Sequence, residues 1–185
     1  MKELVHSVKI EKNLLPPVYF KKLKKIVTNF DFPWYFHFNT LYVDKDLKKF
    51  PQLVNDHQFM FTHHLCSLDK GPSSNWFKDF EPILYFLDSK IKAKNLLRMK
   101  LNLYTNQNKK ITHGSHIDIN DDAKPRKNVT LSILNFMTCN GGTIISGKKY
   151  PSHENEALIF NNLNKHSGIV QTDTQIRVVL NIALE

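Results

Sequence analysis

The stretch LRMKLNLY, from Leu97 to Tyr104, alternates apolar and polar side chains with a period of two. Successive side chains of a β-strand point to opposite faces, so this pattern predicts a strand with one face in a core. Further strand candidates follow it without helical patterns between them, separated by turn signals that include Asn140-Gly141-Gly142 and Pro151-Ser152. These candidates are Val129–Met137, Thr143–Ser146, Ala157–Phe160, His166–Val170 and Ile176–Leu184. Short strands at this spacing predict a sandwich, barrel or jelly roll over residues 95–185.

The first half of the chain mixes helical and strand patterns. Apolar residues recur at helical spacing in 18–29, and a second helix is expected from Trp76 to about Ile91. Residues 30–43 and 58–68 are strand candidates, and 70–74 read as a loop. We therefore expect a single domain, 1–185, that is mainly β with flanking helices. A mixed α/β N-terminal flank, 1–94, would pack on a jelly-roll core, 95–185.

Composition excludes several classes of protein. The 185 residues are 41% hydrophobic and 23% charged, which is ordinary globular usage rather than that of a disordered or repetitive chain. The only cysteines, Cys66 and Cys139, are far apart, so neither a disulfide scaffold nor a zinc ribbon is expected. No apolar run approaches the roughly 20 residues that cross a bilayer, and no signal-peptide pattern opens the sequence. We expect a soluble, cytoplasmic protein with no membrane partner.

The net charge of +9 comes from 23 Lys and three Arg, beside 18 Asn. Dedicated readers of phosphates and bases favour arginine for its bidentate fork, and excess Lys and Asn are what AT-rich codons produce. We interpret the charge as compositional rather than as a nucleic-acid footprint. It follows that Arg98, Arg126 and Arg177 are each expected to have a specific role.

His116-Ile117-Asp118 is the first candidate for chemistry. Residues two apart on a strand share a face, so the imidazole and the carboxylate can reach one ion. His166 follows 48 residues after Asp118 and opens a later strand candidate. Two histidines and one carboxylate can form a facial triad that leaves metal positions open. His113 has no carboxylate two residues on, and His153 precedes the strand candidate Ala157–Phe160, so both are weaker alternatives.

Polar side chains on two other strand candidates could bind an anion. Arg177 is flanked by apolar residues, and a half-buried guanidinium needs an anion, either a carboxylate ligand or an acid such as Asp173. Asn102 and Tyr104 share one face and could donate hydrogen bonds to a bound dicarboxylate. Because Arg98 and Lys100 share that face, it could equally be a polar, solvated surface.

The order Asn102-x-Tyr104, His116-x-Asp118, Val129-Thr130, Gly141-Gly142, His166, Arg177 resembles the Fe(II)/2-oxoglutarate-dependent dioxygenases, most closely the prolyl 4-hydroxylase-like branch. The resemblance covers roughly residues 95–185. The stretch Phe32-Pro33-Trp34 and the strand around Arg98–Leu103 also resemble short phage-encoded members of the class. The sequence departs from the family in lacking a tyrosine over Thr130–Leu134, where some members use one to hold the co-substrate.

The resemblance implies that His116, Asp118 and His166 bind Fe(II), and that Arg177, Tyr104 and Asn102 bind 2-oxoglutarate as co-substrate. It implies hydroxylation of a substrate C–H bond with dioxygen, as 2-oxoglutarate is decarboxylated to succinate, with ascorbate as a candidate reductant. The expected substrate is a peptide or protein side chain, as in prolyl hydroxylases, or a small molecule. The expected location is then the cytoplasm, the host's if the chain is viral.

Two alternatives stay open. One is a nucleic-acid-modifying dioxygenase, but such enzymes tend to carry a second arginine six residues after the first, where this chain has Ala183. The other is a catalytically dead jelly-roll binding module. Substrate choice is expected to lie in loops at the mouth of the site, over 106–112, 120–128 and parts of 30–75. The charged loop with Asp121, Asp122, Lys124 and Arg126 is a candidate lid.

Overall fold

The alternating stretch forms strand β5 (Leu96–Thr105), which lies inside an antiparallel eight-stranded sheet. The computed structural model describes residues 7–39, 58–122 and 124–185. The larger sheet has the order β1-β11-β8-β13-β5-β3-β2, and β4 pairs with β3. The other strands of this sheet are β1 (Val8–Glu11), β2 (Tyr35–His37), β3 (Met60–Ser67), β4 (Gly71–Pro72), β8 (Thr130–Asn135), β11 (Ala157–Asn161) and β13 (Ile176–Leu184).

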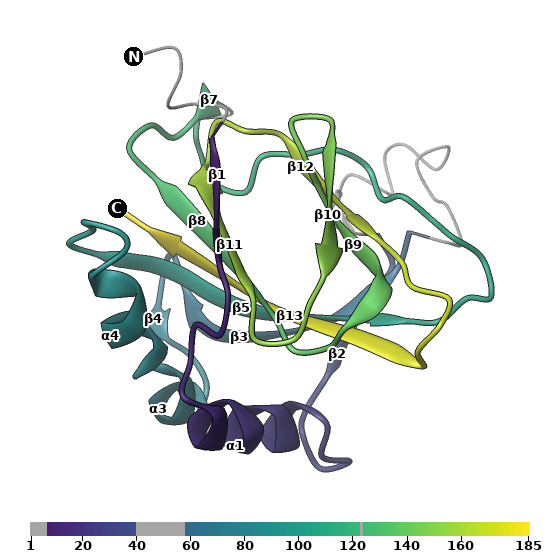
Figure 1. Ribbon diagram of the computed structural model, residues 1–185. Helices are drawn as coiled ribbons and strands as arrows, with labels where there is room; N and C mark the ends of the chain where they lie inside the picture. The colour runs from purple at the N-terminus through teal and green to yellow at the C-terminus, as the bar shows by residue number, and fades with distance from the viewer. Residues whose placement is uncertain (1–6, 40–57, 123) are drawn as a thin grey trace.

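A smaller antiparallel sheet faces the larger one (Figure 1). It has the order β10-β9-β12, formed by β10 (Lys148–Ser152), β9 (Cys139–Ile145) and β12 (His166–Ile169). A short hairpin of β6 (Asn120–Asp121) and β7 (Lys124–Pro125) stands apart. The expectation of a mainly β jelly-roll, or double-stranded β-helix, with flanking helices is confirmed.

The alternation of apolar residues builds two cores on opposite sides of the larger sheet. On β13, Val178, Leu180 and Ile182 belong to the core shared with the helices. Val179 and Ala183, one residue out of phase, belong to the core between the two sheets. The same two-residue period on β5 sends Leu101 and its apolar neighbours toward the helices. Its polar residues therefore point between the sheets.

Among the described residues, three helices cover the outer face of the larger sheet (Figure 1): α1 (Pro17–Val27), α3 (Phe77–Phe80) and α4 (Ile83–Asp88). The single helix expected over 76–91 is wrong, because the chain is divided there into α3 and α4. Pro82 lies between them, and a proline has no N–H with which to continue the helical hydrogen bonds. No helix among these described residues is long and apolar enough to cross a membrane.

Three strand expectations need correction. Gly141 and Gly142 are in β9 rather than in a turn, because β10 packs so closely that a Cβ on Gly142 would lie 2.3 Å from the Tyr150 carbonyl oxygen. Pro151 and Ser152, also expected as a turn, are the last two residues of β10, and the pairing with β9 shifts register between them. The strand expected over 30–43 is reduced to β2, and its residues 40–43 lie outside the described residues.

The N-terminal half contributes to the same sheet as the C-terminal half. β3 pairs with β5 from Phe61–Leu103 to Cys66–Met99, and β1 pairs with β11 from Val8–Phe160 to Glu11–Ala157. The flank thus extends the sheet that carries the polar face of β5, in addition to supplying its covering helices.

Candidate metal and dicarboxylate site

Main-chain pairing brings the two candidate histidine ligands together. The His116 N–H donates to the His166 carbonyl oxygen at 2.9 Å, and the His166 N–H donates back to the His116 carbonyl at 3.0 Å. This isolated antiparallel bridge joins the segment before β6 to the start of β12. The centroids of the two imidazoles lie 4.6 Å apart as a result.

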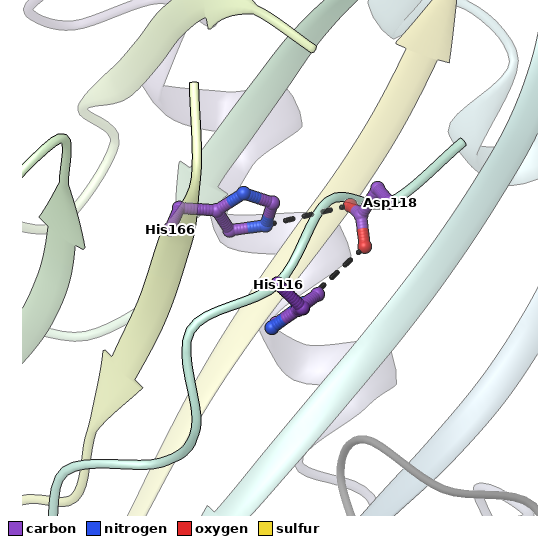
Figure 2. Close-up of side chains that lie close together, drawn as sticks. All are labelled: His116, Asp118 and His166. Carbon is purple, nitrogen blue, oxygen red and sulfur yellow. Dashed lines mark ion pairs between the residues drawn. The ribbon is translucent and has the colours of Figure 1, made fainter. Parts of the chain in front are cut away.

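Asp118 completes a cluster of three ligand side chains (Figure 2). Its Oδ1 lies 3.4 Å from His116 Nε2, and its Oδ2 lies 3.6 Å from His166 Nε2. One ligand atom from each of the three residues falls within 4.8 Å of the others. The sequence-predicted triad is therefore assembled in space, although His166 is 48 positions from Asp118 in the chain.

Arg98 holds the carboxylate of this cluster. Its Nη2 lies 2.7 Å from Asp118 Oδ2, and its Nη1 donates to the Asp118 carbonyl oxygen at 3.4 Å. Burial alone would raise the pKa of Asp118, but the Arg98 charge, the His166 charge and hydrogen bonds from His116 and His166 hold that pKa well below its usual range. Asp118 is therefore ionised at neutral pH and able to bind a cation.

The triad opens into a cavity of about 370 Å³ between the two sheets. The polar face of β5 lines it with Arg98, Lys100, Asn102 and Tyr104. The alternative interpretation of this face as a solvated surface is therefore wrong, because the smaller sheet covers it. Asn102 and Tyr104 are 3% and 8% exposed. Burial raises the pKa of Tyr104, so its hydroxyl is neutral and can donate a hydrogen bond.

Arg177 lies in the same cavity and lacks an acidic partner among the described residues. Its side chain is buried, its Nη2 donates to Thr143 Oγ1 at 3.2 Å, and its guanidinium carbon lies 5.2 Å from the Tyr104 ring centroid. Nε and Nη1 have no hydrogen-bond partner among the described residues. Asp173, the acid that sequence reasoning offered, instead accepts from the Asn140 N–H at 2.8 Å. A buried guanidinium with two unused donor groups has the chemistry to bind a carboxylate.

His113 is buried in this cavity but is not part of the three-residue cluster. Its ring centroid lies 5.3 Å from that of Tyr104, and within the described part of the chain neither of its nitrogens has a hydrogen-bond partner. Burial, with the nearby Arg177 charge, lowers its pKa to about 4, so the ring is neutral at pH 7. His153 is exposed and lies outside the cluster.

The charged loop after the triad forms the β6–β7 hairpin, and Arg126 anchors its end. The Arg126 Nε and NH2 donate to the two carboxylate oxygens of Glu185 at 2.9 and 2.6 Å. The three arginines thus have separate settings. Arg98 contacts the Asp118 carboxylate, Arg177 lines the cavity, and Arg126 forms an ion pair with Glu185. The role of the β6–β7 hairpin as a lid remains a prediction.

The donor groups fit iron and a dicarboxylate. Two imidazoles and one carboxylate on one side of a cation are the ligand set of non-haem Fe(II) oxygenases, with positions left for a chelating co-substrate. The unused donors of Arg177 in the same cavity match a second carboxylate of that co-substrate. Sequence reasoning missed Arg98 as a contact of the triad. The sequence did indicate that Arg98 shares a strand face with Asn102 and Tyr104, which would have placed it near the site.

No family model matches the sequence, and the comparison with curated proteins gives no significant match. Solved structures do match over nearly the whole chain. A prolyl hydroxylase from Trichoplax adhaerens, in complex with a hypoxia-inducible factor oxygen degradation domain peptide, has a TM-score of 0.66 and 10% identity over 98% of this chain and 87% of that one. A 2OG-Fe(II) oxygenase family oxidoreductase from Burkholderia pseudomallei has a TM-score of 0.63 and 8% identity over 95% and 84%.

A viral collagen prolyl hydroxylase from Paramecium Bursaria Chlorella virus-1, in its 2OG complex, has a TM-score of 0.52 and 12% identity over 95% and 93% of the two chains. At these identities the comparisons establish the fold. The chain has the fold of the 2-oxoglutarate- and Fe(II)-dependent oxygenases, prolyl 4-hydroxylases included, and an intact His-x-Asp…His triad lies in its cavity.

Proposed function

We propose that this chain is an Fe(II)- and 2-oxoglutarate-dependent dioxygenase that hydroxylates a C–H bond of a peptide or protein side chain. One observation carries the proposal: the His116, Asp118 and His166 cluster and the unpaired guanidinium of Arg177 line one cavity. A site with only a structural metal would not need the buried cation, and a site with only an anion would not need the triad.

The roles of the residues follow from their positions. His116, Asp118 and His166 would hold Fe(II), which with 2-oxoglutarate and dioxygen supplies the oxidising chemistry, giving succinate, carbon dioxide and a hydroxylated product. Arg177 would bind the carboxylate of 2-oxoglutarate that is remote from the metal. Hydrogen bonds from Tyr104 and Asn102 would orient the co-substrate. The Tyr104 ring stacks against Arg177, and Asn102 is two residues before Tyr104 on β5.

Apolar residues line part of the cavity. Met60, Ile133 and Val179 line its walls beside the charged groups. Fixed charges in a site of low water content act more strongly on a bound co-substrate than they would in water. The protein's own contribution is thus to orient two reactants and to exclude solvent.

A peptide substrate is supported by a second hollow beside the cavity. This hollow, of about 740 Å³, lies over the β2–β3 edge and is lined in part by Thr62, His64 and Tyr35. Thr62 and His64 pair across strands with Asn102 and Lys100, which line the first cavity. A chain segment with one residue at the triad would have room to continue into this hollow. Two of the similar structures are also prolyl hydroxylases, one with a peptide bound.

The nucleic-acid alternative has less support. Position 183, where such enzymes tend to carry a second arginine, is an alanine, and Arg98, its partner in the strand register, pairs with Asp118. The dead-module alternative would require an unpaired buried arginine to be kept without an anion, at a cost in stability. The cytoplasmic location and the use of ascorbate remain predictions.

The test is an anaerobic titration of 2-oxoglutarate into the Fe(II)-loaded protein, following the visible charge-transfer band of a chelated keto acid. We expect a band in the wild type that is absent from Asp118→Ala and His166→Ala. His116→Ala should also abolish succinate formation from 2-oxoglutarate. A folded, iron-exposed wild type without the band would overturn the proposal in favour of the binding module.

A further inference from the structure

One positive charge in the cavity has no counterpart. The lining includes three cationic side chains, Arg98, Lys100 and Arg177, and one carboxylate, Asp118. Arg98 is paired with Asp118, and Arg177 is assigned to the co-substrate under the proposed function. Within the described part of the chain, no hydrogen bond or ion pair engages Lys100. The Asp118 carboxylate acts on the half-buried Lys100 ammonium only at longer range and is already paired with Arg98, so the environment of Lys100 is suited to an added anion.

Asn181 gives a second, independent sign of a ligand at the same place. It is the cross-strand partner of Lys100, on β13, and lines the same cavity. The residue is 8% exposed and its Oδ1 is buried without a hydrogen-bond partner. Buried polar atoms are almost always hydrogen-bonded, so this unused amide oxygen beside the cavity indicates a missing hydrogen-bond donor, such as an N–H or O–H group of a ligand. The Asn181 NH2 group can donate to an anion and its oxygen can accept from a ligand N–H.

The spacing separates this pair from the co-substrate position. In the β5–β13 register, Lys100 pairs with Asn181, while Tyr104 pairs with Arg177. Four residues along a strand correspond to about 13 Å at the usual rise. A five-carbon dicarboxylate that is chelated at the triad and held by Arg177 has both carboxylates engaged, so neither is left for Lys100. A different anionic group therefore suits Lys100.

We propose that Lys100 and Asn181 form an anion-binding subsite for the primary substrate, so that the substrate carries a carboxylate or a phosphate close to the oxidised C–H bond. This inference rests on the proposed function and specifies its substrate class as an acidic one. For a peptide, the anion is an Asp, Glu or phosphorylated side chain near the target residue, or a free C-terminus.

The test uses protein loaded with Zn(II) and N-oxalylglycine, an unreactive 2-oxoglutarate analogue that fills the co-substrate position. Inorganic phosphate and acetate are titrated in separately as minimal probes of the two anion types, and the Asn181 side-chain amide is followed by NMR. We expect a saturable shift in the wild type and in Lys100→Arg. In Lys100→Met we expect binding at least about tenfold weaker, the effect of losing a charged hydrogen bond. Lys149→Met, which changes an exposed lysine on β10, is the matched control.

A second arm separates this inference from the proposed function. The affinity of 2-oxoglutarate for the Fe(II)-loaded protein is measured by the charge-transfer band in wild type and Lys100→Met. We expect the same affinity in both. If Lys100→Met loses 2-oxoglutarate affinity as Arg177→Met does, Lys100 belongs to the co-substrate position and the subsite is overturned. The subsite is also overturned if phosphate and acetate bind Lys100→Met as they bind the wild type. In either case a band in the wild type leaves the dioxygenase assignment intact.

The choice between the two anions follows from the same titrations. A tighter response to phosphate than to acetate assigns the subsite to a phosphorylated substrate, and the reverse assigns it to a carboxylate. No response to either probe in the loaded wild type would overturn the proposal. Peptides that differ only by Glu or Gln beside a target residue then provide the confirming assay, with the gain of one oxygen atom by mass spectrometry as readout.

Discussion

Arg98 and Asp118 form an ion pair at 2.7 Å, although they are on separate segments of the chain. The side chains are 14% and 6% exposed, so both charges lie largely out of water. Arg98 engages Oδ2 and the main-chain carbonyl of Asp118, which fixes the carboxylate and leaves Oδ1 toward His116. Partners of metal ligands that act in this way tune the ligand and hold its orientation.

Removing only one partner of this pair should be costly. For Arg98→Met we expect metal-free protein to be destabilised by about 3 kcal/mol, because a buried carboxylate loses its counter-charge. The double variant Arg98→Met with Asp118→Leu should recover most of that loss. Denaturant unfolding in the presence of a chelator measures both. Equal stability of Arg98→Met and wild type would show that the pair is not buried in solution.

Replacing Arg177 should raise the stability of the protein but remove its binding of the co-substrate. Its guanidinium is buried with only one hydrogen bond, so Arg177→Met should make the protein without co-substrate more stable, by about 1–3 kcal/mol. The same variant should lose thermal stabilisation by 2-oxoglutarate in the presence of Zn(II), while still binding the metal. Thermal unfolding with and without each ligand tests this. A variant that is still stabilised by 2-oxoglutarate would remove Arg177 from the co-substrate site.

Gly142 should not tolerate a side chain. A Cβ there would meet the Tyr150 carbonyl oxygen at 2.3 Å and the Pro151 Cα at 3.2 Å, and both belong to the backbone of the neighbouring strand. We expect Gly142→Ala to cost about 2–3 kcal/mol of unfolding free energy, as overpacking does elsewhere. Gly147→Ala is the comparison, since that position has a positive φ but nothing within 4 Å. A cost no larger than that of Gly147→Ala would contradict the close packing of β9 and β10.

Stability should fall in mild acid because His113 is buried and neutral. Its pKa is lowered from 6.5 to about 4, so below pH 6.5 the unfolded chain binds a proton that the folded protein refuses. The contribution of His113 is therefore fully present above pH 6.5 and is lost as pH falls toward 4, by about 3 kcal/mol in total.

The measurement is the unfolding free energy of metal-free protein at pH 7, 5.5 and 4.5. His113→Gln should show a shallower decline than wild type over this range, and the difference between the two isolates His113 from other titrating groups. Parallel curves would mean that the His113 ring is accessible to protons in the folded state.

The strands and the triad were predictable because local patterns encode them. The two-residue period of Leu97–Tyr104 and of Ile176–Leu184 depends only on strand geometry, and His116-x-Asp118 depends on the same period. What the polar face of β5 contacts depends on β12, about 65 residues later. A sheet with one solvated face gives the same alternation, so sequence reasoning could not place Arg98 against Asp118.

Other differences have equally non-local causes. Glycines favour turns, but Gly141 and Gly142 serve the close approach of β10, which no local pattern records. β1 is only four residues long and is stabilised by pairing with β11, about 150 residues away. Burial of Arg177 without an acid also could not be read from the sequence, where Asp173 was available as a partner.

The reciprocal main-chain hydrogen bonds between His116 and His166 bear on how the protein gains and loses its metal. The backbone, rather than an ion, sets the separation of the two imidazoles, so the ligands need little reordering when a cation arrives. The scaffold should outlast removal of its iron, and a preparation stripped by a chelator should regain metal on simple mixing. The protein would then bind iron reversibly, and the fraction of protein that holds iron would follow the iron concentration around it.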